Sequence, residues 1–483
     1  MNIVQKITEE QIIQLRNDLL RSKKLFEDDS FTLRAPQHRI KWLRPHEICS
    51  NPQFIVEGVS RFDVNQGALG NCWFMAAIDN LTQHKQLFQR VVCDTNSSFT
   101  DGTYCGLFHF RFWYFGSWTN IIIDDRLPTR DGKLVFVQSK SQNEFWPALL
   151  EKAYAKLHGG YEILKGGHIT EAFSNLTGGV TEVYDLKDPP QNFYGMVLKA
   201  FKRNTLMGAS KYKESKNIGL PGGHAYAITH VTPVVDIYGN VTNLIRIRNP
   251  WGNEEEYTGD WSDYSIKWKN ISIEEKQRIK WNAKGDGEFW MSFKDFLFHF
   301  DYLDICNLTP DMLTREPHSG RQWKVTTFQE VWTKNGKNQH EFSAVDPDPD
   351  DNEDYCTIVV AIMYISRNRK DINRLGLKIT SPQDKKFIKV TKRDDYARRE
   401  NVYRFDIMPG QYHFEVLSFD TQNNFEYLFR IFYETKKTDT IYPMLFDSRV
   451  LSSCNNLSKK GKKVNRINYY AQKKSGTKTC NIM

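Results

Sequence analysis

The sequence predicts an α+β protein in which a mixed region of helices and strands precedes an antiparallel β-sandwich. Three observations predict it. An apolar run of helical length begins at Cys72, directly after a Gly-Ala-Leu-Gly turn. Strand-like segments with aromatic and β-branched residues follow up to about residue 309. From residue 310 onward, short strand-like segments dominate and turn residues separate them, a spacing typical of a sandwich.

In the first region, helices are predicted where apolar residues recur at helical spacing and cap or stop signals flank them. Strands are predicted where β-branched and aromatic residues cluster between turns. The expected helices are Thr8 to Ser22, a segment from Cys72, and Phe145 to Leu157; the expected strands are Phe108 to Phe115, Trp118 to Ile123, Ala225 to Val235, and Leu244 to Ile247. A helical first half and a stranded second half predict two subdomains that face each other.

In the second region, seven strands are predicted: Gln322 to Thr327, Thr357 to Ser366, Gly376 to Thr380, Lys386 to Val390, Asn401 to Ile407, Gln411 to Ser418, and Glu426 to Tyr433. The expected division of the chain is an N-terminal helical region (1–47), a catalytic domain (48–309, with subdomains 48–175 and 176–309), a sandwich (310–437) and a basic tail (438–483).

Composition limits the classes of protein to consider. Of the 483 residues, 40% are apolar and 13% aromatic, which excludes a largely disordered chain. The N-terminus lacks the apolar segment of a secretory signal. The eight cysteines are scattered without a CxxC pair, which argues against a zinc site and a disulfide framework and suits a reducing compartment. We therefore expect a cytoplasmic protein.

The net charge of +8 comes from the tail. Residues 458–483 carry eight Lys or Arg and no acid, so the rest of the chain is neutral and no nucleic-acid partner is expected. The tail ends Cys480-Asn-Ile-Met483, which fits a prenylation motif. A lipid on Cys480 together with the basic residues would favour the anionic inner face of a membrane. The alternative is a chance ending on a disordered tail.

Cys72 is the first candidate catalytic residue. The segment Gln66-Gly-Ala-Leu-Gly-Asn-Cys72-Trp-Phe places a thiol at the start of a helix, where its pKa is expected to fall. Gln66 is a candidate amide donor for a tetrahedral oxyanion. A lone buried cysteine before a tryptophan is more often structural, so Cys72 needs partners.

His224 and Asn249 are the candidate partners. His224 follows Gly222-Gly223 and enters a predicted strand, which suits a general base. Asn249, in Arg-Asn-Pro-Trp-Gly, can fix the imidazole tautomer, and Trp251 can shield that hydrogen bond from water. Taken singly, a histidine beside glycines is usually a loop histidine and Asn-Pro-Trp-Gly a turn. Together, Gln66, Cys72, His224 and Asn249 follow one another in the order found in papain-like cysteine proteases.

The chain resembles the calpain family from about Phe26 to Phe432. The resemblance is carried by Gln66 to Trp73, Asp124-Asp-Arg-Leu-Pro-Thr, Glu151-Lys-Ala-Tyr-Ala-Lys, Gly222-Gly-His-Ala-Tyr, Arg248-Asn-Pro-Trp-Gly and Asp286-Gly-Glu-Phe-Trp-Met. It implies a papain-like two-subdomain protease core and a C2-like β-sandwich, with protein substrates. Asn71 departs from the family, where many members carry Asp.

The resemblance also implies two calcium ions that bring the subdomains into register. The first would use the carbonyls of Val56 and Gly58 with Asp63 and Glu144. The second would use Glu256, Asp263, Asp286 and Glu288 with the carbonyl of Lys284. Glu255 is an alternative to Glu256, and without the resemblance these acids would be ordinary surface charges. All are oxygen donors, as calcium prefers.

Many calpains end in a penta-EF-hand domain, but no segment here matches an EF-hand loop, so no EF-hand small subunit is expected. The acidic stretch at residues 346–354 either contacts a basic face of the core, binds calcium at a membrane, or forms a solvated loop. Two functions remain: a calcium-activated endopeptidase using Cys72, His224 and Asn249, or a calcium-sensing membrane scaffold with vestigial catalysis. The intact catalytic set favours the first.

Overall fold

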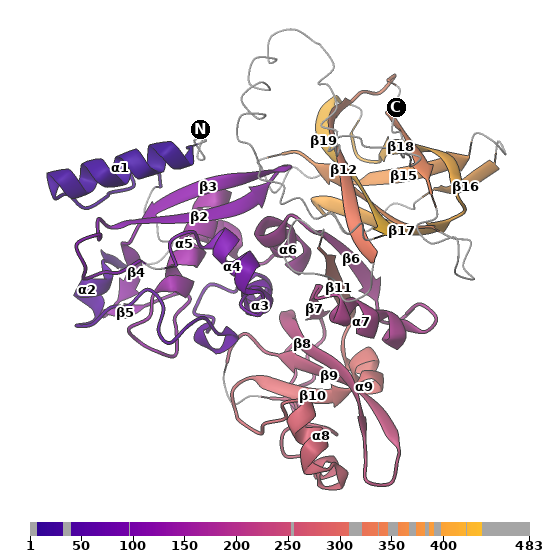
Figure 1. Ribbon diagram of the computed structural model, residues 1–483, viewed down its shortest axis with the longest axis horizontal. Helices are drawn as coiled ribbons and strands as arrows, with labels where there is room; N and C mark the ends of the chain where they lie inside the picture. The colour runs from indigo at the N-terminus through magenta and orange to yellow at the C-terminus, as the bar shows by residue number, and fades with distance from the viewer. Residues whose placement is uncertain are drawn as a thin grey trace. The chain divides into compact units, whose positions relative to one another are not determined.

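The computed structural model describes most of the chain, in two units that are considered separately, Met1–Leu308 and Thr309–Met483 (Figure 1). The described residues are 7–31, 40–95, 97–252, 256–308, 321–336, 338–345, 356–366, 373–381, 386–390, 398–421 and 423–436. Cys480, Glu255, the acidic stretch at 346–354 and the basic tail lie outside these residues. Among the described residues, no helix has the length and apolar character needed to cross a membrane.

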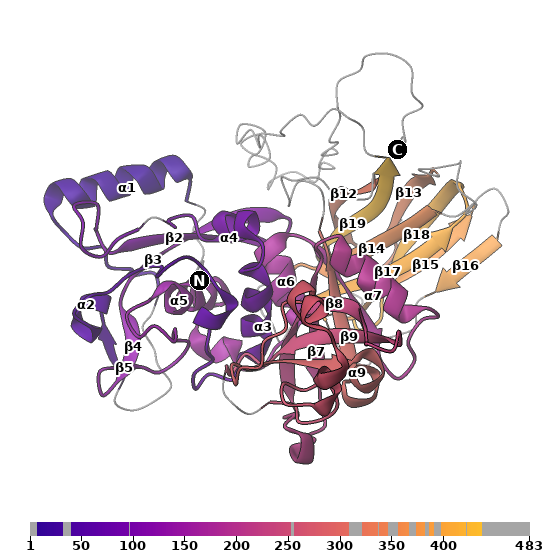
Figure 2. The same ribbon diagram turned by 60° about the horizontal axis from the view of Figure 1, so that its bottom comes forward.

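Helix α1 (Glu9–Ser22) begins where the sequence predicts, because Thr8 and Gln11 form a capping box. Its apolar face, including the buried Ile12, packs on the hairpin of β2 (Leu107–Tyr114) and β3 (Ser117–Asp124). Figures 1 and 2 both show α1 alongside this hairpin. The predicted hairpin strands are confirmed.

The first half of this unit is mainly helical, as predicted. Helix α3 (Cys72–Leu81) is almost wholly buried, and α5 (Trp146–His158) ends at Gly159, whose φ of 99° gives a left-handed cap. The remaining elements of this half are α2 (Pro45–Ile48), α4 (Lys85–Val91), α6 (Ile169–Thr177), 3-10 turns at Arg61–Asp63 and Tyr161–Leu164, and a three-stranded sheet of β1 (Lys41–Leu43), β4 (Leu127–Arg130) and β5 (Lys133–Leu134).

The second half is built on a six-stranded antiparallel sheet in the order β10-β9-β8-β7-β11-β6. The predicted strands correspond to β8 (His224–Val235) and β9 (Val241–Arg248), which pair through the turn at Asp236 to Asn240. Helix α3 packs against β7 and β8. The other elements are β6 (Val180–Asp185), α7 (Phe193–Lys202), β7 (Leu206–Lys211), α8 (Ile273–Arg278), β10 (Glu288–Ser292), α9 (Phe293–His299), β11 (Tyr302–Asn307) and 3-10 turns at Lys216–Ile218 and Ile266–Asn270.

The second unit has two four-stranded antiparallel sheets, β12-β19-β14-β17 and β13-β18-β15-β16, which share one apolar core. This confirms the predicted β-sandwich. Their bounds are β12 (Arg321–Trp332), β13 (Gln339–Ala344), β14 (Cys356–Tyr364), β15 (Leu375–Ser381), β16 (Lys386–Val390), β17 (Glu400–Ile407), β18 (Gly410–Ser418) and β19 (Phe425–Lys436). The prediction missed β13, although its buried His340 and Phe342 alternate with polar neighbours.

Candidate active site

Cys72 is the first residue of α3, as the sequence predicts. The loop before it requires glycine, because a Cβ at Gly67 would lie 2.1 Å from the carbonyl oxygen of Phe136 and Gly70 has a φ of 67°. Asn71 is the N-cap residue, but its side chain makes no capping hydrogen bond. The first backbone N–H groups of α3 are therefore left for other partners.

Burial is the largest influence on the Cys72 thiol, and it raises the pKa. Hydrogen bonds from the backbone N–H groups of Ala225, Trp73 and Cys72 itself act in the opposite direction and are smaller. The expected lowering of the pKa by the helix start is therefore outweighed. Because Ala225 directly follows His224, the thiol lies beside the start of β8.

This thiol predicts a pH dependence for the calcium-free protein. The thiolate is the reactive form, so a raised pKa means that Cys72 reacts with iodoacetamide more slowly at pH 7 than a free cysteine, and faster as the pH rises to 9. Peptide mass spectrometry would follow Cys72 separately from the other cysteines. A rate that is already at a plateau below pH 7 would contradict this, because it would require a thiolate–imidazolium pair.

His224 and Asn249 are brought together from the start of β8 and the residue after β9. The Nε2 of His224 lies 2.8 Å from Oδ1 of Asn249, and the same oxygen accepts the backbone N–H of Trp251 at 3.1 Å. An oxygen acceptor on Nε2 places the proton there and leaves Nδ1 as the basic nitrogen of the neutral ring. Both side chains are buried, and burial lowers the pKa of His224 to about 4.

Trp251 lies against this pair, with its ring centroid 4.6 Å from that of His224. Gln66 is tied to the same turn, since its backbone N–H donates to the carbonyl of Pro250 at 3.2 Å. The side-chain Oε1 of Gln66 is buried and has no hydrogen-bond partner among the described residues. The structure thus places the five predicted catalytic residues on three segments of one unit: the loop that leads into α3, the start of β8 and the turn after β9.

Sequence reasoning missed a buried pair beneath the nucleophile. The Nδ2 of Asn71 donates to Oε1 of Glu151 on α5 at 2.6 Å, and the N–H of Val137 donates to Oε2 at 3.1 Å. Asn71 is fully buried and Glu151 nearly so, and burial raises the pKa of Glu151 to about 8. The pair holds the N-cap of α3 against α5. The only feature of the sequence that had drawn attention to this pair was Asn71 itself, which stands where many calpains carry Asp.

Asn71→Asp is expected to destabilise the protein increasingly as pH rises. The substitution removes the donor and sets a second carboxylate against Glu151, so one of the two must keep a proton that the unfolded chain releases near pH 4. A raised folded-state pKa loses stability as pH rises through it, by up to about 1.4 kcal/mol per pH unit for one group. Thermal melts at pH 5.5 and 8.5 would measure the difference from wild type. Asn71→Asp/Glu151→Gln should recover the loss, and equal melting shifts at both pH values would contradict the assignment.

The first set of expected calcium ligands lies on neighbouring loops. The N–H of Val56 donates to Oε1 of Glu144 at 2.7 Å, and the N–H of Ser60 donates to Oδ2 of Asp63 at 2.7 Å. Burial raises the pKa of Glu144 to about 7, and the charge of Asp63 adds to the rise. Gly58 has a φ of 95°, which suits a turn that presents carbonyl groups.

The second set gathers around Asp263. Its Oδ2 accepts the N–H of Lys284 at 2.7 Å, whereas its Oδ1 is buried without a partner among the described residues. Oε1 of Glu256 accepts the N–H of Gly287 at 2.6 Å. Burial raises the pKa of Asp263 to about 7, and the charges of Glu256 and Asp286 add to the rise. Carboxylate and carbonyl oxygens are the donors that a hard cation such as calcium prefers.

Glu288 has a different partner from the other carboxylates. Its two oxygens accept hydrogen bonds from Nε and Nη2 of Arg61, each at 2.8 Å. Nε of Arg246 lies 3.3 Å from Oε2. Arg61 lies two residues before Asp63, and Glu288 lies two residues after Asp286. This ion pair therefore joins the two expected calcium loops across 227 residues, a link with no local sequence signal.

Among the described residues, no group of three or more His, Cys, Asp or Glu side chains is arranged to hold a metal ion. The carboxylates of the two sets instead accept backbone N–H groups or pair with arginine. Side-chain or loop movement would be needed for them to converge on a cation.

Comparison of the sequence with known proteins points to one family. A model of the calpain family of cysteine proteases matches residues 21–307. The chain is 43% identical to Calpain-A of Drosophila melanogaster over 475 residues, which covers 87% of this chain and 57% of that protein. It is 39% identical to Calpain clp-1 of Caenorhabditis elegans and 38% identical to the Calpain-2 catalytic subunit of Homo sapiens, covering 60% and 67% of those proteins. The chain thus spans little more than half the length of several relatives that it matches. It belongs to the calpain family of cysteine proteases.

Proposed function

We propose that this chain is a calcium-activated cysteine endopeptidase that makes limited cuts in protein substrates. The observation that carries the proposal is the 2.8 Å contact between His224 and Asn249, with the Cys72 thiol beside the adjoining Ala225. This arrangement supplies a nucleophile, a base and a group that orients the base.

In the proposed reaction, the basic Nδ1 of His224 takes the thiol proton as the sulfur of Cys72 attacks the substrate carbonyl. The amide of Gln66 and the backbone N–H of Cys72 stabilise the oxyanion. The C–N bond then breaks, the imidazolium protonates the leaving amine, and a thioester remains on Cys72. Water deprotonated by His224 hydrolyses the thioester and returns the proton to the thiol. Asn249 keeps the ring oriented, and Trp251 excludes water from their hydrogen bond.

Calcium dependence is proposed on the carboxylates of the two loops. Asp63 and Glu144, with the carbonyls of Val56 and Gly58, would hold one ion, and Glu256, Asp263 and Asp286, with Lys284 and Glu288, the other. Bound calcium would supply the positive charge that neutralises these crowded carboxylates. The raised pKa values of Glu144 and Asp263, both about 7, support the proposal because burial and a neighbouring acid outweigh the hydrogen bonds that each carboxylate accepts.

The test is cleavage of casein by the purified chain at graded calcium concentrations. Asp63→Asn and Asp286→Asn are each expected to raise the calcium needed for half-maximal cleavage about ten-fold or more, because one charged ligand is lost at each site. Asp188→Asn is the matched control, since Asp188 is exposed and far in sequence from both sets. Cleavage without calcium, or unchanged requirements in both variants, would refute the calcium assignment. Calcium binding without any cleavage would favour the scaffold function.

A further inference from the structure

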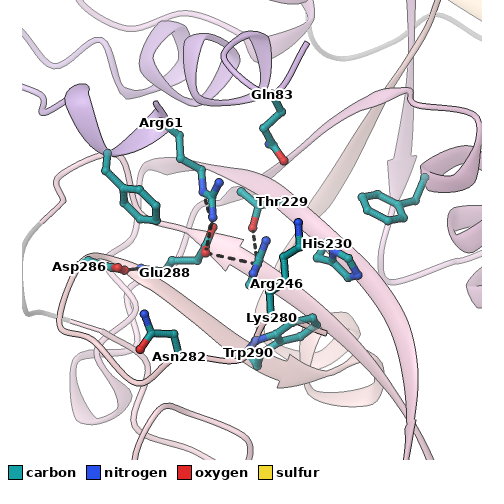
Figure 3. Close-up of a pocket in the computed structure, with 12 residues that line it drawn as sticks. Arg61, Gln83, Thr229, His230, Arg246, Lys280, Asn282, Asp286, Glu288 and Trp290 are labelled. Carbon is teal, nitrogen blue, oxygen red and sulfur yellow. Dashed lines mark hydrogen bonds and ion pairs between the residues drawn. The ribbon is translucent and has the colours of Figure 1, made fainter. Parts of the chain in front are cut away.

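A cavity of about 300 Å³ lies where the first and second halves of the Met1–Leu308 unit meet. Arg61, Phe62 and Gln83 border it from the first half, and residues of β8, β9 and β10 with the segment after α8 border it from the second (Figure 3). Its volume is at the lower end of the range for small-molecule sites. None of the five catalytic residues lines it.

The lining is rich in hydrogen-bond donors. Arg61, Arg246 and Lys280 face the cavity together with the amides of Gln83 and Asn282, against only two carboxylates, Asp286 and Glu288. Glu288 is already engaged by the two nitrogens of Arg61, and Oδ1 of Asp286 accepts the N–H of Glu288 at 3.1 Å. The terminal nitrogens of Arg246 and the ammonium group of Lys280 are therefore left to face the cavity.

Arg246 carries the argument. Its side chain is nine-tenths buried, and its guanidinium carbon lies 5.3 Å from the ring centroid of Trp290. Both of its described polar contacts, to Thr229 at 3.0 Å and to Glu288 at 3.3 Å, run from Nε. The two terminal nitrogens have no partner among the described residues. These two nitrogens are the donors that an acceptor in the cavity can reach, and a largely buried cation is stabilised by such an acceptor.

Lys280 adds a second cation from a different segment. It follows α8, has a φ of 55°, and forms no ion pair or hydrogen bond through its side chain among the described residues. A positive φ is uncommon for lysine, and here it sets this residue at the cavity wall. Guanidinium, ammonium and amide donors that converge on one cavity are the groups that bind phosphate and sulfate oxygens.

We infer that this cavity is a binding site for a small tetrahedral oxyanion, a phosphate or sulfate group, held by Arg246 and Lys280 between the two halves. The planar guanidinium of Arg246 supplies two parallel donors, and Lys280 supplies a point charge. The amides of Gln83 and Asn282 contribute further donors. None of the five catalytic residues takes part in this site, whereas Asp286 and Glu288, which border the cavity, also belong to the second proposed calcium set.

Isothermal titration of the EDTA-treated full chain with sodium sulfate, at constant ionic strength set with sodium chloride, tests the site. Wild type is expected to bind one sulfate. Arg246→Gln and Lys280→Asn should each weaken binding at least about ten-fold, with Lys269→Asn as the matched control because Lys269 is an exposed lysine that does not line the cavity. Arg246→Gln removes an ionic partner of Glu288 and could therefore disturb folding. Lys280→Asn avoids this problem, because asparagine tolerates the positive φ of residue 280, and this variant is expected to fold.

Two results would overturn the inference. One is that sulfate gives no binding signal beyond that of sodium chloride at the same ionic strength. The other is that Lys280→Asn binds sulfate with the affinity of wild type. A repeat with inorganic phosphate under the same conditions should give the same order of variants. Because the titration contains no calcium and no substrate, its outcome is independent of the protease proposal.

Discussion

Cys72→Ala is expected to abolish peptide-bond cleavage, with a loss of more than about 10⁴-fold in kcat. The sulfur is the protein atom that attacks the substrate carbonyl in the proposed mechanism, and alanine leaves His224 without a thiol to deprotonate. The His224–Asn249 hydrogen bond does not depend on the sulfur, so folding should be preserved. Hydrolysis of a fluorogenic peptide at saturating calcium, with circular dichroism of both proteins, measures the effect.

Cys93→Ala is the matched control. Cys93 is another half-buried free thiol, but burial raises its pKa to about 12 and its Sγ faces the carbonyl oxygen of Arg90 at 3.8 Å. A histidine–asparagine pair, His109 and Asn120, lies nearby, but the described contact between Cys93 and His109 runs from the backbone N–H of Cys93 to the carbonyl of His109. This variant should therefore keep wild-type kcat. Residual activity of more than a few per cent in Cys72→Ala, or equal losses in the two variants, would refute Cys72 as the nucleophile.

The motifs around Cys72, His224 and Asn249 were visible in the sequence because each is set by local requirements. A helix start, a glycine turn and a strand end are each encoded within a few residues. The close approach of Gly67 to Phe136 shows why residue 67 of that loop tolerates no side chain. Likewise, the alternating strands of the sandwich were predicted because one face of each strand packs on a shared core.

What the sequence did not reveal depends on pairs far apart in the chain. Asn71 meets Glu151 across 80 residues, and Arg61 meets Glu288 across 227. No periodicity or turn signal links such partners. Strand β13 was missed for a related reason: its alternation is short, and only pairing with β18 makes it a strand.

The prediction that the pKa of Cys72 is lowered was wrong, because it considered the start of the helix and not the burial of the thiol. The N–H groups of Trp73 and Cys72 do lower the pKa, as expected from their position. The larger effect is desolvation by surrounding residues, which only the folded structure reveals. In a calpain-type core, this makes the basicity of His224 and its approach to the thiol the decisive factors for the proposed proton transfer.

Removing Arg61 is expected to have the second-largest effect, on both stability and calcium response. Arg61→Met leaves the Glu288 carboxylate, whose side chain is 9% exposed, with Arg246 as its remaining ionic partner. Breaking a buried pair by removing one partner costs roughly 3–5 kcal/mol, and the low end is expected because Arg61 is itself 21% exposed. Urea unfolding of the calcium-free proteins would measure this loss.

The same ion pair is a direct polar link between the loops of Asp63 and Asp286. If those loops bind calcium as proposed, Arg61→Met should also flatten the calcium dependence of cleavage, because each loop would then respond separately. Arg61→Met/Glu288→Gln separates the two effects: the double variant removes both charges of the pair, and the introduced amide oxygen can still accept a hydrogen bond from Arg246, so it should regain part of the stability, yet it still lacks the link. A double variant whose calcium response is as steep as that of wild type would show that the two loops communicate by another route, whatever the stability measurements give.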